Sequence, residues 1–229
     1  MHLFITSVRQ KEDRLIIDEP RVVHQVRNVL RMQPGEIFEV QEVQQDTSTR
    51  QQVQLEKASK TQLELTGLSV QSETKKQEPI CLAVALPNKT DKLTMIVQKL
   101  TEVGIDKIIF RPSQRSQLRS LEPKTLERLE KIVLEATEQS QRRFLPEITF
   151  VPHFAQAVSA PHSRCLFDWD GKSTKKVKYT WGIIWPEGGF TDEEKAYFTS
   201  LAIDTVALWS TILRMETATI IGGWLLVQR

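Results

Sequence analysis

Short apolar runs and stretches in which apolar and polar residues alternate dominate the first third of the chain. The apolar runs lie at residues 3–6 and 14–17, and the alternating stretches lie at 35–41, 52–56 and 62–66. A period of two is typical of strands that are buried on one face. Residues 24–30 instead show a helical pattern that ends before the turn-forming pair Pro34-Gly35. Several short strands at this close spacing predict a small β-barrel of about 70 residues.

The pattern changes after residues 71–79, a polar stretch that ends in proline and is typical of a linker. Beyond it, continuous apolar runs that suit strands buried on both faces alternate with stretches of helical periodicity. We predict strands at 80–86, 107–110, 165–167, 181–185 and 205–208, and helices at 90–103, 123–140, from 191 onward and at 216–227. Alternating strands and helices predict an α/β domain with a mostly parallel sheet. The expected organisation is a barrel over 1–72, a linker over 73–79 and an α/β domain over 80–229.

Composition narrows the class of protein further. The chain has 229 residues, of which 40% are hydrophobic and 26% are charged, as in an ordinary globular protein. Lys and Arg number 31 against 29 Asp and Glu, so nucleic-acid binding would require local clusters of positive charge. There are two cysteines, no long apolar run and no apolar leader, so we expect a cytoplasmic protein that does not bind membranes.

Two other classes of site are disfavoured. The sequence has neither G-x-G-x-x-G nor G-x-x-x-x-G-K-[ST], which argues against a Rossmann dinucleotide site and a P-loop. His153, His162 and Cys165 do not have the spacing of a zinc site, so we expect no metal.

The most informative segments are two late loops, each lying between a strand and a helix. The first reads I-I-W-P-E-G-G-F-T-D-E-E at 183–194, and the second reads V-A-L-W-S-T-I-L-R-M-E-T-A at 206–218. Ligands of open α/β sheets bind outside the carboxyl ends of strands, and adjacent glycines let backbone N–H groups approach a ligand. Glu187 supplies a carboxylate there. An ordinary strand-to-helix turn is the alternative interpretation of the first loop.

Arg214 and Glu216 lie near the start of the last helix. The helix dipole favours anions at that end, so it does not explain Arg214. We therefore expect Arg214 to bind an anion or to orient a base, the alternative being a solvated arginine paired with Glu216.

Seven motifs, in order along nearly the whole chain, resemble those of the RsmE family of SPOUT methyltransferases. Besides the two late loops, the similar segments are A-L-P-N-K at 85–89, Q-K-L-T-E-V-G at 98–104, R-S at 115–116, E-A-T-E-Q-S-Q-R-R at 135–143 and H-Q-V-R-N-V-L-R-M at 24–32. The resemblance implies a PUA-like barrel followed by a SPOUT α/β domain with a trefoil knot. It also implies methylation of uridine N3 in 16S ribosomal RNA of the small subunit, with S-adenosylmethionine as the methyl donor, by a homodimer.

Carried onto this chain, the resemblance assigns roles to named residues. The cofactor-binding residues would be Leu86, Ile184, Trp185, Pro186, Glu187, Gly188, Gly189, Leu208, Trp209, Ile212 and Leu213. Arg214 would stabilise negative charge on the base, and Glu187 or Glu216 would position the base or take its proton. Two departures stand out, because Trp185 and Trp209 replace glycines of the family. Their indoles could stack on adenine or fill the pocket, so a catalytically impaired RNA-binding protein remains an alternative, as does methylation of another base.

The RNA-binding residues are expected among clustered arginines and lysines. The candidates are Arg27, Arg31, Lys89, Arg111, Arg115, Arg119, Arg142 and Arg143. Arg27 and Arg31 are spaced for one face of a helix, and Arg111, Arg115 and Arg119 repeat every four residues. Phosphate contacts of this kind position a protein on RNA, although any single residue could equally be solvated surface charge.

Overall fold

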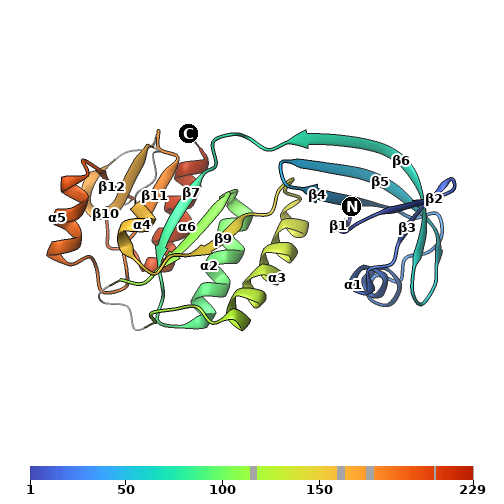
Figure 1. The fold of residues 1–229 in the computed structure, drawn as a ribbon, viewed down its shortest axis with the longest axis horizontal. Helices are drawn as coiled ribbons and strands as arrows, with labels where there is room; N and C mark the ends of the chain where they lie inside the picture. The colour runs from blue at the N-terminus through green and yellow to red at the C-terminus, as the bar shows by residue number, and fades with distance from the viewer. Residues whose placement is uncertain (114–117, 159–162, 174–177, 209, 229) are drawn as a thin grey trace. The chain divides into compact units, whose positions relative to one another are not determined.

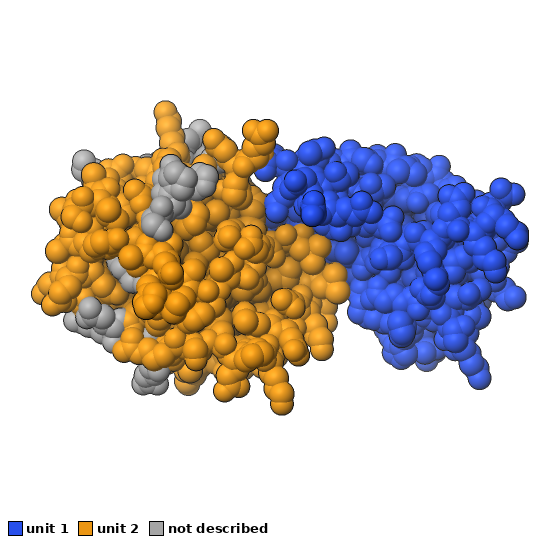
Figure 2. Space-filling view, viewed as in Figure 1, with its two compact units in different colours: residues 1–76, 137–144 blue, residues 77–136, 145–229 orange. Residues whose placement is uncertain are grey.

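A computed structural model of the protein describes residues 1–113, 118–158, 163–173, 178–208 and 210–228. The chain forms two compact units, coloured separately in Figure 2. Unit 1 comprises Met1–Lys76 together with Thr137–Phe144, and unit 2 comprises Gln77–Ala136 and Leu145–Arg229. The segment at 137–144 was expected in the α/β domain, but it packs with the N-terminal unit.

Unit 1 is built on a six-stranded mixed sheet with the order β1-β4-β5-β6-β3-β2. Its strands are β1 (Leu3–Ile5), β2 (Arg9–Lys11), β3 (Arg14–Ile17), β4 (Ile37–Gln44), β5 (Thr47–Ala58) and β6 (Leu63–Thr74). The β1–β4 pair is parallel and the other pairs are antiparallel. The alternating sequence explains the packing, since Val53 and Leu55 of β5 and Leu63 and Leu65 of β6 point into one apolar core.

The predicted linker begins later than expected. Thr47 pairs with Thr74 and Arg50 pairs with Gln71, so the polar residues 71–74 form the end of β6. These residues are exposed, and backbone pairing rather than side-chain burial holds them in the strand. A pattern based on hydrophobicity therefore could not detect this part of β6.

A short helical segment of unit 1 covers the core. It consists of α1 (Pro20–His24) followed by the π-helical turn η1 (Gln25–Val29), and Pro20 occupies the first turn, where it is well tolerated. Arg31 lies beyond this segment with a φ of 54°, in the left-handed region. The expectation that Arg27 and Arg31 share one helix face is therefore wrong, although both side chains are exposed.

Unit 2 contains a six-stranded parallel sheet with the order β12-β10-β11-β7-β8-β9 (Figure 1). The strands are β7 (Cys81–Ala85), β8 (Lys107–Arg111), β9 (Glu147–Phe150), β10 (Arg164–Ser173), β11 (Trp181–Ile184) and β12 (Asp204–Ala207). Every neighbouring pair in it is parallel, as predicted. β9 was not predicted, because its four residues, E-I-T-F, carry only a weak apolar pattern.

Helices cover both faces of this sheet. Leu82 and Val84 of β7 pack with α2 (Thr90–Val103), α3 (Pro123–Ser140) and α6 (Met215–Val227). Cys81 and Ala83 of the same strand pack on the other face with α4 (Phe154–Val158) and α5 (Asp192–Ser200). Successive side chains of a strand point to opposite faces, so a strand between two helical layers must be apolar throughout.

The helix predictions for unit 2 are confirmed in detail. α2 and α3 have the predicted bounds, and α6 begins one residue earlier than expected. Gly222 and Gly223 of α6 allow close packing against neighbouring elements. A β-carbon at Gly223 would lie 2.7 Å from Leu100 Cδ2, and one at Gly222 would lie 3.1 Å from Ile184 Cδ1. Close packing on α2 and β11 thus offsets the cost of glycine in a helix.

Candidate functional site

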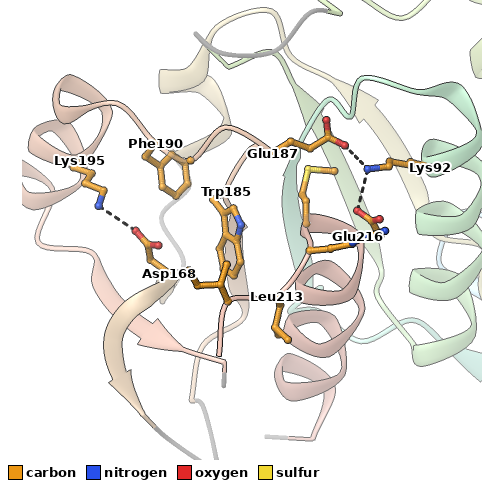
Figure 3. A pocket seen from close by; sticks show the side chains of 12 residues that line it. Lys92, Asp168, Trp185, Glu187, Phe190, Lys195, Leu213 and Glu216 are labelled. Carbon is orange, nitrogen blue, oxygen red and sulfur yellow. Dashed lines mark hydrogen bonds and ion pairs between the residues drawn. The ribbon is translucent and has the colours of Figure 1, made fainter. Parts of the chain in front are cut away.

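The two late loops meet at a pocket of about 610 Å³ in unit 2, shown in Figure 3. The loop after β11 contributes Trp185, Glu187, Gly189 and Phe190, and the segment that leads into α6 contributes Ile212, Leu213, Arg214, Met215 and Glu216. Asp168 of β10, Lys92 of α2 and Lys195 of α5 complete the lining. The pocket lies at the carboxyl end of the sheet, where parallel α/β folds place ligands.

The loop after β11 has a defined conformation. The Gly189 N–H donates to the Pro186 carbonyl at 2.9 Å, and Gly189 has a φ of 72°, which favours glycine. α5 then begins with a capping box. The Glu194 N–H donates to the Thr191 hydroxyl at 3.2 Å, while the Thr191 N–H donates to the Glu194 carboxylate at 3.0 Å. The predicted helix start at Thr191 is confirmed, and the turn fixes the backbone between Trp185 and α5.

Arg214 and Glu216 flank the start of α6. Arg214 is the residue before the first helical position, and its carbonyl accepts a hydrogen bond from the Ala218 N–H at 2.9 Å. Its side chain is exposed and lines the pocket. Glu216 lies in the first turn, where the helix dipole favours a carboxylate. Both therefore face the pocket from the positive end of a helix.

Lys92 links the two loops through their carboxylates, as Figure 3 shows. Its ammonium nitrogen lies 2.5 Å from Glu187 Oε1 and 3.3 Å from Glu216 Oε2. Asn88 Nδ2 donates to the other oxygen of Glu187 at 2.5 Å. Hydrogen bonding to Glu187 raises the pKa of Lys92, so its ammonium is charged at neutral pH.

The pKa of Glu216 is shifted in the opposite direction. Burial alone would raise it, but a hydrogen bond from its own backbone N–H and the charge of Lys92 outweigh burial and lower the pKa of Glu216. Glu216 is therefore a carboxylate at neutral pH. Sequence reasoning missed Lys92, although a lysine in the first turn of a helix, against the dipole, is a signal of the kind that identified Arg214.

A second charged pair lies at the other end of the pocket. The Lys195 ammonium is 3.6 Å from Asp168 Oδ2, and the Asp168 side chain is almost fully buried. The register between β10 and β12 shifts just after Phe167, and such irregularities re-aim side chains at strand ends. The indole of Trp185 and the ring of Phe190 lie between the two charged ends (Figure 3).

The structure separates the predicted cofactor residues into groups. Trp185, Glu187, Gly189, Ile212 and Leu213 line the pocket. Pro186 and Gly188 belong to the same loop but are not among the described lining residues. Leu86, Ile184 and Leu208 belong to the hydrophobic core beside the sheet, so their side chains support the pocket rather than form its wall. Trp209 lies outside the described residues.

One predicted RNA-binding residue is misplaced. Arg111 is fully buried at the end of β8, so its side chain cannot contact RNA in this structure. Burial lowers the pKa of Arg111 to about 10, and the charge of Glu194 partly opposes that shift. The four-residue spacing that suggested a surface patch fails because Arg111 is the last residue of β8, a strand flanked on both sides by other strands.

The other predicted RNA-binding residues differ in exposure. Arg27, Arg31, Lys89 and Arg119 are exposed, although Arg119 also donates to the Ser113 carbonyl at 2.7 Å. Arg142 and Arg143 are partly buried, and Arg143 donates to Gln71 Oε1 at 2.9 Å within unit 1. Arg115 lies outside the described residues.

The described residues contain neither a metal-binding cluster nor a membrane-spanning helix. Within the described ranges, no group of three His, Cys, Asp or Glu side chains is placed to hold a metal ion. None of the helices in the same ranges is long and apolar enough to cross a membrane.

Comparisons with known proteins identify similar chains. The model of the RNA methyltransferase domain family matches residues 74–223. Ribosomal RNA small subunit methyltransferase E of Rickettsia conorii is 32% identical over 170 residues, which cover 67% of this chain and 68% of that protein. The protein of the same name from Bacillus subtilis is 30% identical over 217 residues, which cover 86% of this chain and 83% of that protein.

A solved structure has the same fold. The crystal structure of a ribosomal RNA small subunit methyltransferase E from Neisseria gonorrhoeae, bound to S-adenosyl methionine, superimposes with a TM-score of 0.76 at 21% identity. The alignment covers 97% of this chain and 95% of that one. At this identity the likeness shows a shared fold.

Proposed function

Since this chain belongs to the ribosomal RNA small subunit methyltransferase E family of RNA methyltransferases, we propose that it transfers a methyl group from S-adenosylmethionine to uridine N3 in 16S ribosomal RNA. The observation that carries the proposal is the pocket where the two late loops meet, with Arg214 and Glu216 on one wall. Both loops carry the sequence features that predict a ligand site at the carboxyl ends of the strands.

The pocket suits a nucleoside that carries a charged amino-acid group. Its volume of about 610 Å³ lies within the usual range of about 300–1,000 Å³ for small-molecule sites. Trp185 and Phe190 offer aromatic faces for a flat ring, and Leu213 and Met215 offer apolar contact. Asp168 and Lys195 offer partners for an ammonium and a carboxylate. When bound, S-adenosylmethionine supplies an electrophilic methyl group on a sulfonium.

Side chains of the pocket would position the base, remove its proton and stabilise the negative charge that develops on it. Glu216, a carboxylate at neutral pH, can accept the N3–H of uridine and remove its proton. Glu187, held by Lys92 and Asn88, can position the base from the facing loop. Negative charge that develops on the uracil oxygens would be stabilised by Arg214 and Lys92, which both line the pocket.

The finer features of the fold belong to the same proposal. We assign unit 1 to a PUA-like RNA-binding barrel and unit 2 to a SPOUT domain with a trefoil knot. The mixed sheet of unit 1 and the parallel sheet of unit 2 support this assignment. The same proposal includes a homodimer that acts on the small ribosomal subunit in the cytoplasm, as the resemblance implies.

RNA contacts are assigned to a reduced set of basic residues. We retain the exposed Arg27, Arg31, Lys89 and Arg119, together with Arg115, Arg142 and Arg143. Contacts to phosphates weaken as salt increases, so each substitution to alanine should reduce both RNA affinity and its salt dependence.

The test is methyl transfer in vitro. Unmodified small subunits would be incubated with the protein and S-adenosylmethionine labelled in its methyl group, and the product mapped by nuclease digestion and mass spectrometry. We expect label on uridine N3 and a loss of at least about 100-fold in rate for Arg214→Ala. Lys107→Ala, at the opposite end of the sheet, should keep the rate of the unaltered protein. Label on another base would overturn the assignment of uridine N3 and support methylation of a different base, which the sequence analysis left open.

One observation favours a second candidate function. Trp185 lines the pocket at a position where the resemblance leads us to expect glycine. If its indole blocks the methyl donor, the protein binds structured RNA without catalysis. Calorimetry separates the two, since the first candidate requires heat of binding with S-adenosylmethionine and the second requires none.

A further inference from the structure

Arg111 is a fully buried arginine that the proposed reaction does not use. It is the last residue of β8, at the same carboxyl edge of the sheet as the pocket. Burying a guanidinium is costly unless it is paired, so a buried arginine calls for an explanation of what it holds.

Its contacts lie at both ends of the loop after β11. At one end, Arg111 Nη2 donates to the carbonyl of Ile184 at 3.5 Å, directly before Trp185. At the other end, Arg111 Nη1 lies 3.9 Å from Glu194 Oε1 in the first turn of α5. The guanidinium carbon is also 5.6 Å from the centre of the Phe190 ring. A single side chain thus contacts the residues that enter, line and leave the loop.

Glu194 makes the connection to α5 specific. Its Oε2 accepts the Thr191 N–H in the capping box while its Oε1 faces Arg111, and the side chain is almost fully buried. The pairing therefore fixes the helix start relative to β8. The loop between these fixed points carries Trp185, Glu187, Gly189 and Phe190, which all line the pocket.

We infer that Arg111 is a positioning residue that holds the loop after β11 in the shape required to bind the methyl donor. The inference rests on the proposed function for the identity of that ligand. Although burial lowers the pKa of Arg111 to about 10, the group remains charged at neutral pH and can attract Glu194. The alternative is that Arg111 and Glu194 only stabilise the fold and do not affect ligand binding.

The experiment separates positioning from stability with a pair of substitutions. Arg111→Met alone leaves Glu194 buried without its cation, so it should lower the thermal midpoint. Adding Glu194→Gln removes that charge and keeps a capping-box acceptor, so the double variant should regain stability. If Arg111 positions the loop, the double variant should still bind S-adenosylmethionine at least about ten-fold more weakly than the unaltered protein. Lys107→Met, at the other end of β8, should change neither the dissociation constant for S-adenosylmethionine nor the conformation of the loop after β11.

A second readout does not depend on the ligand. Amide hydrogen exchange of the peptide spanning 185–194, measured without cofactor, should be faster in the double variant, while exchange in β7 stays the same. A double variant that binds S-adenosylmethionine normally and protects this peptide normally would overturn the inference. If the unaltered protein binds no S-adenosylmethionine, the proposed function fails, and the exchange result alone decides whether Arg111 holds the loop.

Discussion

Gly182 of β11 offers a stringent test of the packing beneath the pocket. A β-carbon added there would lie 2.7 Å from Phe167 Cε2, 2.8 Å from Leu82 Cδ1 and 2.9 Å from Leu226 Cδ1. These neighbours are fully buried, so none can move into solvent. Overpacking typically costs about 1–3 kcal/mol, and replacing a strand glycine recovers about 0.5–1 kcal/mol. We expect Gly182→Ala to destabilise unit 2 by about 1–2 kcal/mol.

Differential scanning calorimetry of thermal unfolding should detect this loss of stability. It corresponds to a midpoint lower by about 3–8 °C for a domain of this size. Gly67→Ala in β6 is the matched control. Its β-carbon would lie 2.3 Å from Gln51 Nε2, but that atom is the end of a flexible polar side chain that can swing away. We expect Gly67→Ala to change stability by less than about 0.5 kcal/mol. The reasoning is refuted if Gly182→Ala is neutral or if the order of the two variants is reversed.

Three further predictions follow from the described contacts. Lys92→Met removes a charge that lowers the pKa of Glu216, so the pKa of that carboxyl group should rise. The acidic limb of the pH–rate profile should then move to higher pH, because the base must be deprotonated to act. An acidic limb that does not move would exclude Glu216 as the titrating base. Burial raises the pKa of Cys81 to about 12 and also raises that of Cys165. Neither thiol should therefore react with a disulfide reagent at a pH of about 8 until the protein unfolds. Rapid labelling of the folded protein would contradict their burial. The carboxylate of Glu138 accepts hydrogen bonds from the Ile5 N–H and the Arg21 guanidinium, and Glu138→Gln weakens both. The urea midpoint of unit 1 should therefore fall by the equivalent of about 1–2 kcal/mol, while the dependence of the unfolding free energy on urea stays the same. An unchanged midpoint would show that this contact contributes little.

Local patterns were sufficient for much of the fold. α2 and α3 have the predicted bounds because each carries a regular apolar stripe and a clear end, such as Gly104, which closes α2 with a φ of 108°. Five strands of the parallel sheet were detectable because they are largely apolar, as burial on both faces requires, whereas β9 was missed because its residues are less buried. The first pocket loop was identified because a strand, a proline–glycine turn and a helix start follow one another, and the second because Arg214 stands at a helix start where the dipole does not favour a cation.

The remaining features depend on contacts between distant parts of the sequence. Lys92 lies 95 residues from Glu187 and 124 from Glu216, so no local pattern could pair them. Arg111 was assigned to the surface because it stands four residues before Arg115 and eight before Arg119, and only the fold reveals its neighbours Ile184 and Glu194. The residues at 137–144 join unit 1 through long-range hydrogen bonds that spacing along the chain does not encode.

Soaking crystals of the protein with S-adenosylmethionine tests most directly whether the late loops form a methyl-donor site. We predict density for one cofactor molecule per chain, with its adenine against the aromatic wall of Trp185 and Phe190 and its methyl group within reach of Glu216. If the cofactor is absent at saturating concentration while the indole of Trp185 fills the space, the proposed transfer reaction is contradicted.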